Sequence, residues 1–256
     1  MKLAKENSHP LDEHIIFDEK PHIYYIEGES YDKSVTSFIH DFFGEFEPDK
    51  IIDKFYDMWQ SNPSSKYYGL EPDEIKHMWE ENGKLQSQLG TKLHQNIELF
   101  YNEEEIDYDE VEFEHFMNFH KEHMHLKPFR TEWMIYAKDL KLAGSIDMVY
   151  EEEGILHIYD WKRSKEIKEQ NQYQEGKYPL SHLPDCNYWH YSLQLNCYKA
   201  ILEKYYNVKV GDLYLVVLHP DNNNFIKIKA ADLQKEIDML FELRLDDLKN
   251  MELKNE

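Results

Sequence analysis

The sequence predicts an α/β (α+β) fold with a central mixed β-sheet flanked by helices and a helical N-terminal part. Apolar residues recur mainly at helical spacing before residue 125, whereas between residues 129 and 164 they follow strand-like spacing. The remaining pattern is helix, strand, strand and helix, an order typical of a sheet covered by helices. The 256 residues, 41% of them hydrophobic, suit one large domain or a core with an appended subdomain.

The N-terminal elements follow from periodicity and capping signals. Residues 22–32 alternate apolar and polar side chains beside a glycine, which predicts a short strand or hairpin. Ser34 or Thr36 is a candidate N-cap for the helix that follows. Residues 71–102 predict one or two helices, with Gly83 or Gly90 as a break. Further helices are expected at residues 48–60 and 109–124.

The C-terminal elements begin where the period changes. Three strands are expected at residues 129–139, 140–153 and 154–164, and the turns between them favour antiparallel pairing. The expected order then continues with a helix at 188–207, a buried strand at 212–220, a short strand at 224–230 and a closing helix at 231–250. We expect residues 1–87 to form an N-terminal strand and helical region packed on a core of residues 88–256.

Composition narrows the function classes. The net charge of -22 argues against a protein that coats nucleic acid, unless basic residues line one groove or the carboxylates bind divalent cations. The two cysteines, eleven apart, make a disulfide framework, a zinc ribbon or a four-cysteine iron–sulfur cluster unlikely to fit. No apolar run reaches membrane-spanning length, and the N-terminus has no signal-peptide core. We therefore expect a soluble intracellular protein without membrane partners, in the cytoplasm, nucleus, an organelle or a virus-infected cell.

Two acids and a lysine form the candidate reaction site. Asp160 and Lys162 lie two apart at a strand end, so their side chains share a face. If Asp147 lies opposite on the neighbouring strand, two carboxylates and an amine converge. Carboxylates suit Mg²⁺ or Mn²⁺, and a lysine beside them could orient or deprotonate an attacking water. Taken alone, the Asp160–Lys162 triplet is better explained as a solvated strand end.

Two helices carry further polar pairs at a spacing of four residues, which places each pair on one helix face. His94 and Glu98 form the first pair, for which an additional metal ligand and an exposed helix face are both open interpretations. Gln194 and Tyr198 form the second, suited to DNA phosphates and bases or simply to the polar side of an amphipathic helix. Gly90, before Thr91, would let a helix begin close to a phosphate.

The combination of these segments is more specific than any one of them. In order, "GTKLHQNIE", "GSID", "DWK" and "QLNCY" resemble the motifs of the PD-(D/E)XK nuclease superfamily, with the RecB-like and lambda-exonuclease-like branch as the nearest likeness. That branch carries a GxxxH helix with a following acid, a GxxD strand, a (D/E)xK strand and a QxxxY helix. The resemblance spans about residues 88–220 and implies a restriction-endonuclease-like core.

The resemblance also implies roles for individual residues in a DNA nuclease that uses one or two Mg²⁺ or Mn²⁺ ions. Lys162 would act on the water, Glu98 would complete the metal shell, and the chain would resemble members without an iron–sulfur cluster. Glu132 could be a further helper at the site, but a charge at a strand edge is the preferred interpretation. The implied metal ligands are His94, Asp147, Asp160 and the main-chain carbonyl of Trp161. The implied substrate-binding residues are Gln194, Tyr198, Arg163, Lys165 and Thr91.

Three functions remain open at this point. The favoured one is an exonuclease that degrades single- or double-stranded DNA in replication, recombination or repair, as a homo-oligomer or with a partner protein. A structure-specific or restriction-type endonuclease is the second. A non-catalytic nuclease fold or an acidic DNA mimic is the third, and the net charge of -22 motivates it. The complete set of acids and lysine favours an enzyme.

Overall fold

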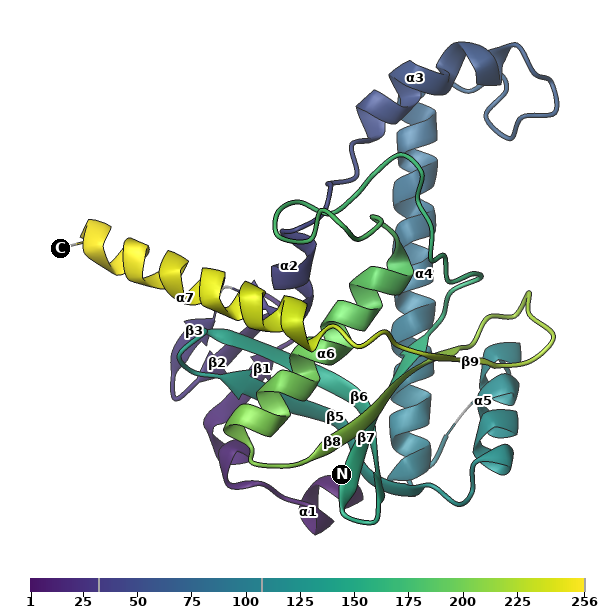
Figure 1. Ribbon diagram of the computed structural model, residues 1–256. Coiled ribbons are helices and arrows are strands. Elements are labelled where there is room, and N and C mark those ends of the chain that lie inside the picture. Colours follow the sequence, from purple (N-terminus) through teal and green to yellow (C-terminus); the bar gives the residue numbers. More distant parts are fainter. Residues whose placement is uncertain (32, 107, 256) are drawn as a thin grey trace. The chain divides into compact units, whose positions relative to one another are not determined.

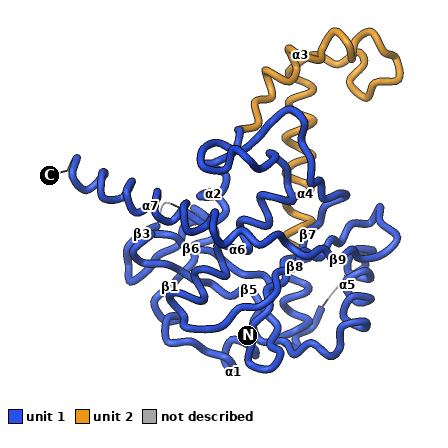
Figure 2. The backbone as a smooth tube through the Cα atoms, in the orientation of Figure 1, with its two compact units in different colours: residues 1–44, 93–256 blue, residues 45–92 orange. Residues whose placement is uncertain are grey.

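The computed structural model describes residues 1–31, 33–106 and 108–255. These residues form two compact units (Figure 2). One unit comprises Met1–Gly44 and Leu93–Glu256, and the other comprises Glu45–Lys92. The long helix α4 (Pro72–Tyr101) contributes to both. The expected division into an N-terminal region of residues 1–87 and a nuclease core of residues 88–256 stays a prediction.

The central sheet of the first unit confirms the predicted mixed topology. Its strand order is β4-β6-β7-β8-β9, and β5 pairs with β6 on the other side. β5, β6 and β7 form an antiparallel meander, β8 runs parallel to β7, and β9 returns antiparallel to β8. The strands are β4 (Lys33–Ser34), β5 (Lys127–Ala137), β6 (Leu142–Glu152), β7 (Ile155–Lys162), β8 (Val210–Val217) and β9 (Ile226–Lys229) (Figure 1).

Helices cover both faces of this sheet. One face packs on α2 (Val35–His40), α6 (Asn187–Tyr205) and α7 (Gln234–Asn255) through a large aliphatic cluster. The other face packs on the C-terminal part of α4 and on α5 (Val111–Glu122) through a cluster rich in aromatic rings. Since side chains alternate along a strand, neighbouring residues of β7 belong to different clusters: Ile158 is in the first, and Tyr159 and Trp161 are in the second.

The N-terminal segment of this unit adds a small sheet. After α1 (Lys2–Glu6) and a 3-10 helix (Pro10–His14), the antiparallel sheet contains β1 (Ile15–Asp18), β2 (Ile23–Ile26) and β3 (Glu29–Tyr31). Its buried side chains pack against Tyr136 of β5 and Ala143 of β6. Ser34 then caps α2, because its Oγ accepts from the Ser37 backbone N–H at 3.0 Å. Of the two expected caps, Ser34 is therefore the actual one.

The second unit contains α3 (Pro48–Gln60) and the first part of α4. Its rings of Trp59, Tyr67 and Trp79 contact one another, and the Trp79 indole N–H donates to the Tyr67 hydroxyl at 2.9 Å. α4 continues through Gly83 and Gly90, so the sequence forms one helix here and the expected helix start at Gly90 is wrong. A single glycine costs a helix only about 1 kcal/mol, which the rest of α4 offsets.

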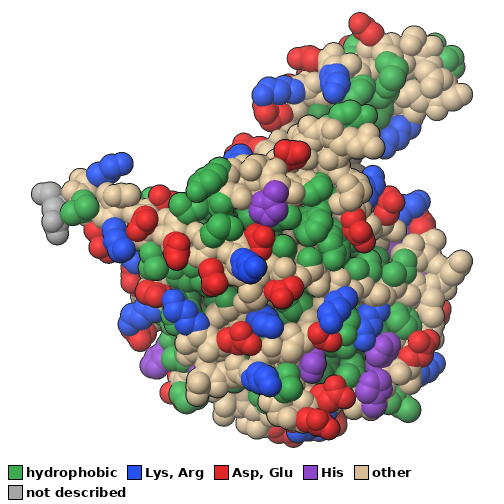
Figure 3. All heavy atoms as spheres, in the orientation of Figure 1, with side chains coloured by type: hydrophobic (Ala, Val, Ile, Leu, Met, Phe, Trp, Pro, Cys, Tyr) green, Lys and Arg blue, Asp and Glu red, His purple; other side chains and the backbone are tan. Residues whose placement is uncertain are grey.

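The surface carries both signs of charge. On the face shown in Figure 3, acidic and basic side chains are interspersed. Within the part of the chain that the structure describes, no helix has the length and apolarity needed to cross a membrane.

Candidate metal centre

Three side chains from three elements of the first unit form a group suited to a metal ion. They are His94 of α4, Glu132 of β5 and Asp147 of β6, and one ligand atom from each lies within 4.8 Å of the others. The His94 Nδ1 lies 3.6 Å from Glu132 Oε1 and 3.6 Å from Asp147 Oδ2. All three side chains are half-buried. The helix and the two strands thus bring together residues that are far apart in the sequence.

The peptide group of Trp161 joins this group to β7. Its N–H donates to Asp147 Oδ2 at 2.9 Å, and its carbonyl oxygen lies 2.8 Å from His94 Nε2. Because a carbonyl only accepts, Nε2 carries a proton here and Nδ1 faces the two carboxylates. The Trp161 carbonyl thus contacts His94, and its role as a metal ligand stays a prediction.

The group of His94, Glu132 and Asp147 contains two acids and one imidazole, so negative charge predominates. Burial works against a charged His94, but Asp147 and Glu132 outweigh it and raise the pKa of His94 to about 9. Burial, together with the nearby Asp160 and Glu132, raises the pKa of Asp147, although His94 opposes this. Asp160 and Glu132 thus raise the cost of ionising Asp147, and a bound cation would lower this cost.

Asp160 and Lys162 form an ion pair at the end of β7. The Lys162 Nζ lies 2.7 Å from Asp160 Oδ2, and Asp160 is only 2% exposed. The ammonium is thus the charge that compensates this buried carboxylate. The ammonium also lies 4.5 Å from the ring centroid of Tyr191, on α6. Burial lowers the pKa of Lys162, but Asp160 and Asp147 more than offset it, so the pKa is raised and the amine stays charged.

Trp161 itself points to the opposite face of the sheet. Its indole is 1% exposed and makes edge contacts with the rings of Phe116 and Phe119 on α5. This orientation agrees with the alternation of side chains along a strand. It explains how one short segment supplies both a core anchor and two site residues.

Gly144 connects the site to α6. A Cβ atom at this position would lie 2.8 Å from Cε1 of Tyr198, so only glycine lets the tyrosine ring approach β6 this closely. The Tyr198 hydroxyl accepts from the Gln194 amide at 3.0 Å, and the same amide lies 3.2 Å from Thr36 Oγ1. These residues border a pocket of about 350 Å³, which is lined by His22, Tyr24, Ser34, Thr36, Ser37, His40, Gly144, Ser145, Gln194 and Tyr198.

The remaining sequence-predicted residues lie outside the His94 group. Glu98 is partly buried, and burial together with Glu132 raises its pKa. The Arg163 guanidinium pairs with Glu112 at 2.6 Å, and both side chains are largely buried. Lys165 is exposed and pairs with Asp221 at 2.8 Å. Thr91 belongs to the second unit, where its hydroxyl donates to the Ser87 carbonyl within α4. The expected DNA contacts of Arg163, Lys165 and Thr91 stay predictions.

For Glu132 the sequence favours a strand-edge charge over a helper at the site. The structure places this residue in the His94 group, which supports the less favoured interpretation. The pairs Thr131–Met148 and Trp133–Ile146 set Glu132 opposite Asp147. Its backbone has a φ of +41°, and its Oε2 accepts from Ser145 Oγ at 2.9 Å. The antiparallel register was the available signal, because a residue facing Asp147 would be its cross-strand neighbour.

Comparison with known protein families identifies the fold. The model of the PD-(D/E)XK nuclease superfamily matches residues 104–253, more than half of the chain. The chain belongs to this superfamily. The matched PD-(D/E)XK region contains Glu132, Asp147, Asp160 and Lys162, whereas His94 precedes it. Membership makes DNA the implied substrate and supports a nuclease that uses divalent metal ions. The RecB-like branch stays a prediction.

Other comparisons add less to the superfamily assignment. No curated protein matches the chain significantly. Among solved structures, the chain is similar to "Crystal structure of SSO0001", with 15% sequence identity over 95% of this chain and 81% of that one. The TM-score is 0.33.

Proposed function

We propose that this PD-(D/E)XK protein is a Mg²⁺- or Mn²⁺-dependent deoxyribonuclease that acts as an exonuclease in DNA replication, recombination or repair. One observation carries the proposal: α4, β5 and β6 direct His94, Glu132 and Asp147 at one another beside the buried Asp160–Lys162 pair. Structural ion pairs do not require such a convergence of acids, whereas a metal site does.

The chemistry of the donor set fits a hard divalent cation. Carboxylate and carbonyl oxygens with one imidazole suit Mg²⁺ or Mn²⁺, and the buried Asp160 carboxylate beside Lys162 offers a further ligand. A bound ion would polarise the phosphoryl oxygen and lower the pKa of a coordinated water. The residues that would hold one or two ions are His94, Glu132, Asp147, Asp160 and the carbonyl of Trp161, with Glu98 beside Glu132.

Lys162 has a charged role in this proposal. Its raised pKa keeps the amine protonated, so it is poorly suited to remove a proton from water. A fixed ammonium instead orients the attacking water and stabilises the negative charge that develops on phosphate. Asp160 and the Tyr191 ring hold the ammonium in place. Of the two roles open from the sequence, orientation is therefore the better supported one.

The pocket beside the site supports an exonuclease over an endonuclease. Its volume of about 350 Å³ falls in the range typical of small-molecule sites, roughly 300–1,000 Å³. That size suits a terminal nucleotide better than a continuous duplex. Thr36, Ser37 and Gln194 offer neutral donors for phosphate oxygens, and Tyr198 completes the lining.

Digestion of end-labelled linear DNA and covalently closed circular DNA, each with Mg²⁺ or Mn²⁺, tests the proposal. We expect linear DNA to be degraded from an end, circular DNA to stay intact, and Asp160→Asn and Lys162→Ala to lose at least a hundredfold in rate. Lys204→Ala, which removes an exposed lysine that pairs with Asp139, is the matched control. Cutting of circular DNA would instead indicate an endonuclease. Activity in Asp160→Asn equal to that of the unmodified protein would remove this site from the reaction.

A further inference from the structure

The segment that joins β7 to α6, residues 163–186, begins and ends at the candidate site. It starts directly after Lys162 and leads into α6, whose Tyr191 ring contacts the Lys162 ammonium. A connection of this length without helices or strands is uncommon in a compact domain, and such loops usually have a function. This segment is therefore placed to contact a substrate that approaches the site.

The backbone of this segment is fixed internally. The Asn171 side chain donates to the Asp185 carbonyl at 2.6 Å, and the Asp185 N–H donates to the Gln174 carbonyl at 2.9 Å. Leu180 and Leu183 are buried in the main core cluster, at 0% and 4% exposure. These contacts close the loop on itself and attach its middle to the core.

The same segment is attached to the C-terminal end of α2. The Lys177 N–H donates to the Phe42 carbonyl at 2.7 Å, and the Lys177 Nζ donates to the Asp41 carbonyl at 2.9 Å. α2 ends at His40, which lines the pocket together with Thr36. The residues around Lys177 therefore lie next to the helix that forms one side of the pocket.

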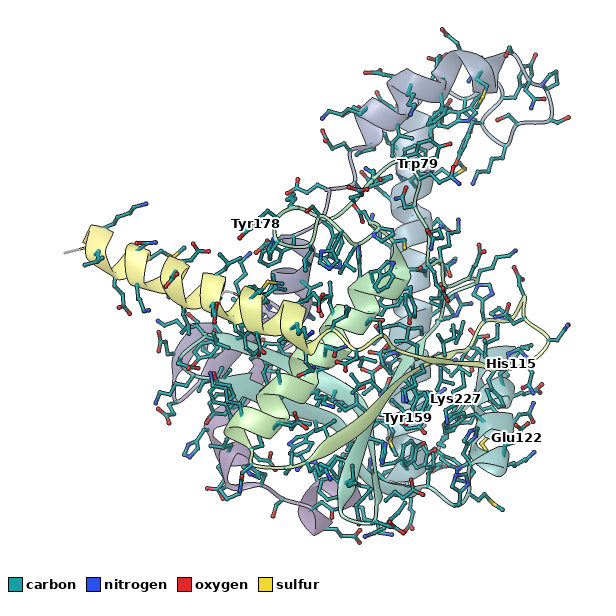
Figure 4. The ribbon with its side chains drawn as sticks, viewed as in Figure 1. Trp79, His115, Glu122, Tyr159, Tyr178 and Lys227 are labelled. Carbon is teal, nitrogen blue, oxygen red and sulfur yellow. The ribbon has the colours of Figure 1, made fainter. Side chains whose placement is uncertain are left out.

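Two tyrosines of this fixed loop project into solvent. Tyr173 is 88% exposed and Tyr178 is 80% exposed, whereas Tyr191 and Tyr198 at the site are partly or fully buried. Figure 4 labels Tyr178 on the loop above α2. Aromatic rings with this much exposed surface present faces on which the bases of a nucleic acid can stack. A fixed backbone also lowers the entropy lost when such rings bind a ligand.

We propose that Tyr173 and Tyr178 form a stacking platform for unpaired bases, so that the enzyme takes single-stranded DNA toward the pocket. This rests on the proposed nuclease function and names its substrate class. With a net charge of -22, the protein can gain little affinity by neutralising phosphates. Stacking needs no cation, and it needs bases that are not already paired in a duplex.

Binding measured without cleavage tests the platform. Fluorescence anisotropy with labelled single-stranded and duplex oligonucleotides, in chelator, compares the unmodified protein with Tyr173→Ala, Tyr178→Ala and both phenylalanine variants. Loss of one ring should weaken single-strand binding by roughly 5- to 100-fold, the contribution of one stacked base. Phenylalanine should restore it. The slope of affinity against salt should not change, because no charge is removed. Ile16→Ala, 66% exposed on β1, is the control.

The binding measurements can overturn or support the stacking platform. Unchanged single-strand affinity in both alanine variants, equal losses for single strands and duplex, or no binding of single strands by the unmodified protein would each overturn the platform. A tyrosine-dependent preference for single strands supports it. If that preference is found but neither Mg²⁺ nor Mn²⁺ gives cleavage, the platform stands and the proposed nuclease function fails.

Discussion

His94 should make the metal-free protein sensitive to alkaline pH. Its folded pKa of about 9 lies above its ordinary value of 6.5, so its protonated form stabilises the fold below about 6.5 and this stabilisation is lost as pH rises through 9. The expected loss is on the order of 2 kcal/mol. The raised pKa of Asp147 acts at lower pH. Thermal unfolding in chelator from pH 6.5 to 9.5 measures the effect.

The matched variant for this pH dependence is His94→Gln, which cannot be protonated. Over the same pH range it should lack the loss of stability that follows the His94 pKa of about 9, so that only the titration of Asp147 remains. A metal ion competes with the proton for the imidazole, so metal affinity of the unmodified protein should rise over that range. An identical pH profile for the variant and the unmodified protein would assign the effect to another group.

Replacing Glu132 should affect the stability of the fold and the nuclease rate in different ways. A φ of +41° costs most side chains about 1 kcal/mol, but asparagine tolerates this conformation. Glu132→Asn should therefore unfold at higher denaturant than Glu132→Gln, which loses the same charge and keeps the strain. Both should lose metal affinity and nuclease rate. A less stable asparagine variant would show that the backbone is not strained.

At the level of elements, Gly144 controls how closely α6 approaches β6. The alanine Cβ would meet the buried Tyr198 ring at 2.8 Å, so Gly144→Ala should destabilise the first unit by about 1–3 kcal/mol. Gly83→Ala is the control, since nothing lies within 4 Å of that position and alanine should stabilise α4 by about 1 kcal/mol. Urea unfolding measures both. Equal stability of Gly144→Ala and the unmodified protein would contradict the packing argument.

The elements themselves could be predicted, because their signals are local. The change of hydrophobic period placed β5, β6 and β7 correctly, and the order of helix and strands after them is also confirmed. Glu132 could not be assigned from periodicity, since its role depends on the register with β6 and on a left-handed backbone. Arg163 lies two residues after Trp161, on the same side of the chain, and its guanidinium pairs with Glu112. A count of basic residues does not reveal such a pairing, so it suggested a DNA contact instead.

For the whole molecule, the acidic composition should make divalent cations stabilising. An ion that binds only the folded state adds about 2.7 kcal/mol at a hundredfold excess over its Kd. Mg²⁺ or Mn²⁺ should therefore raise the melting temperature more than NaCl at equal ionic strength, which only screens the charge of -22. Asp147→Asn should remove the difference. An equal rise with NaCl would mean that screening, and not a site, is responsible.

The main-chain hydrogen bonds of Trp161 determine which side chains this position can accept. Asp147 and His94 hold only its main-chain amide, and its indole Nε1 has no hydrogen-bond partner among the described residues. The site therefore depends on the bulk of residue 161 rather than on its polar chemistry. Trp161→Phe should keep nuclease activity, whereas Trp161→Ala should cost about 3–5 kcal/mol in urea unfolding. A hydrophobic side chain of any shape that fills the space beneath β7 would preserve the centre above it.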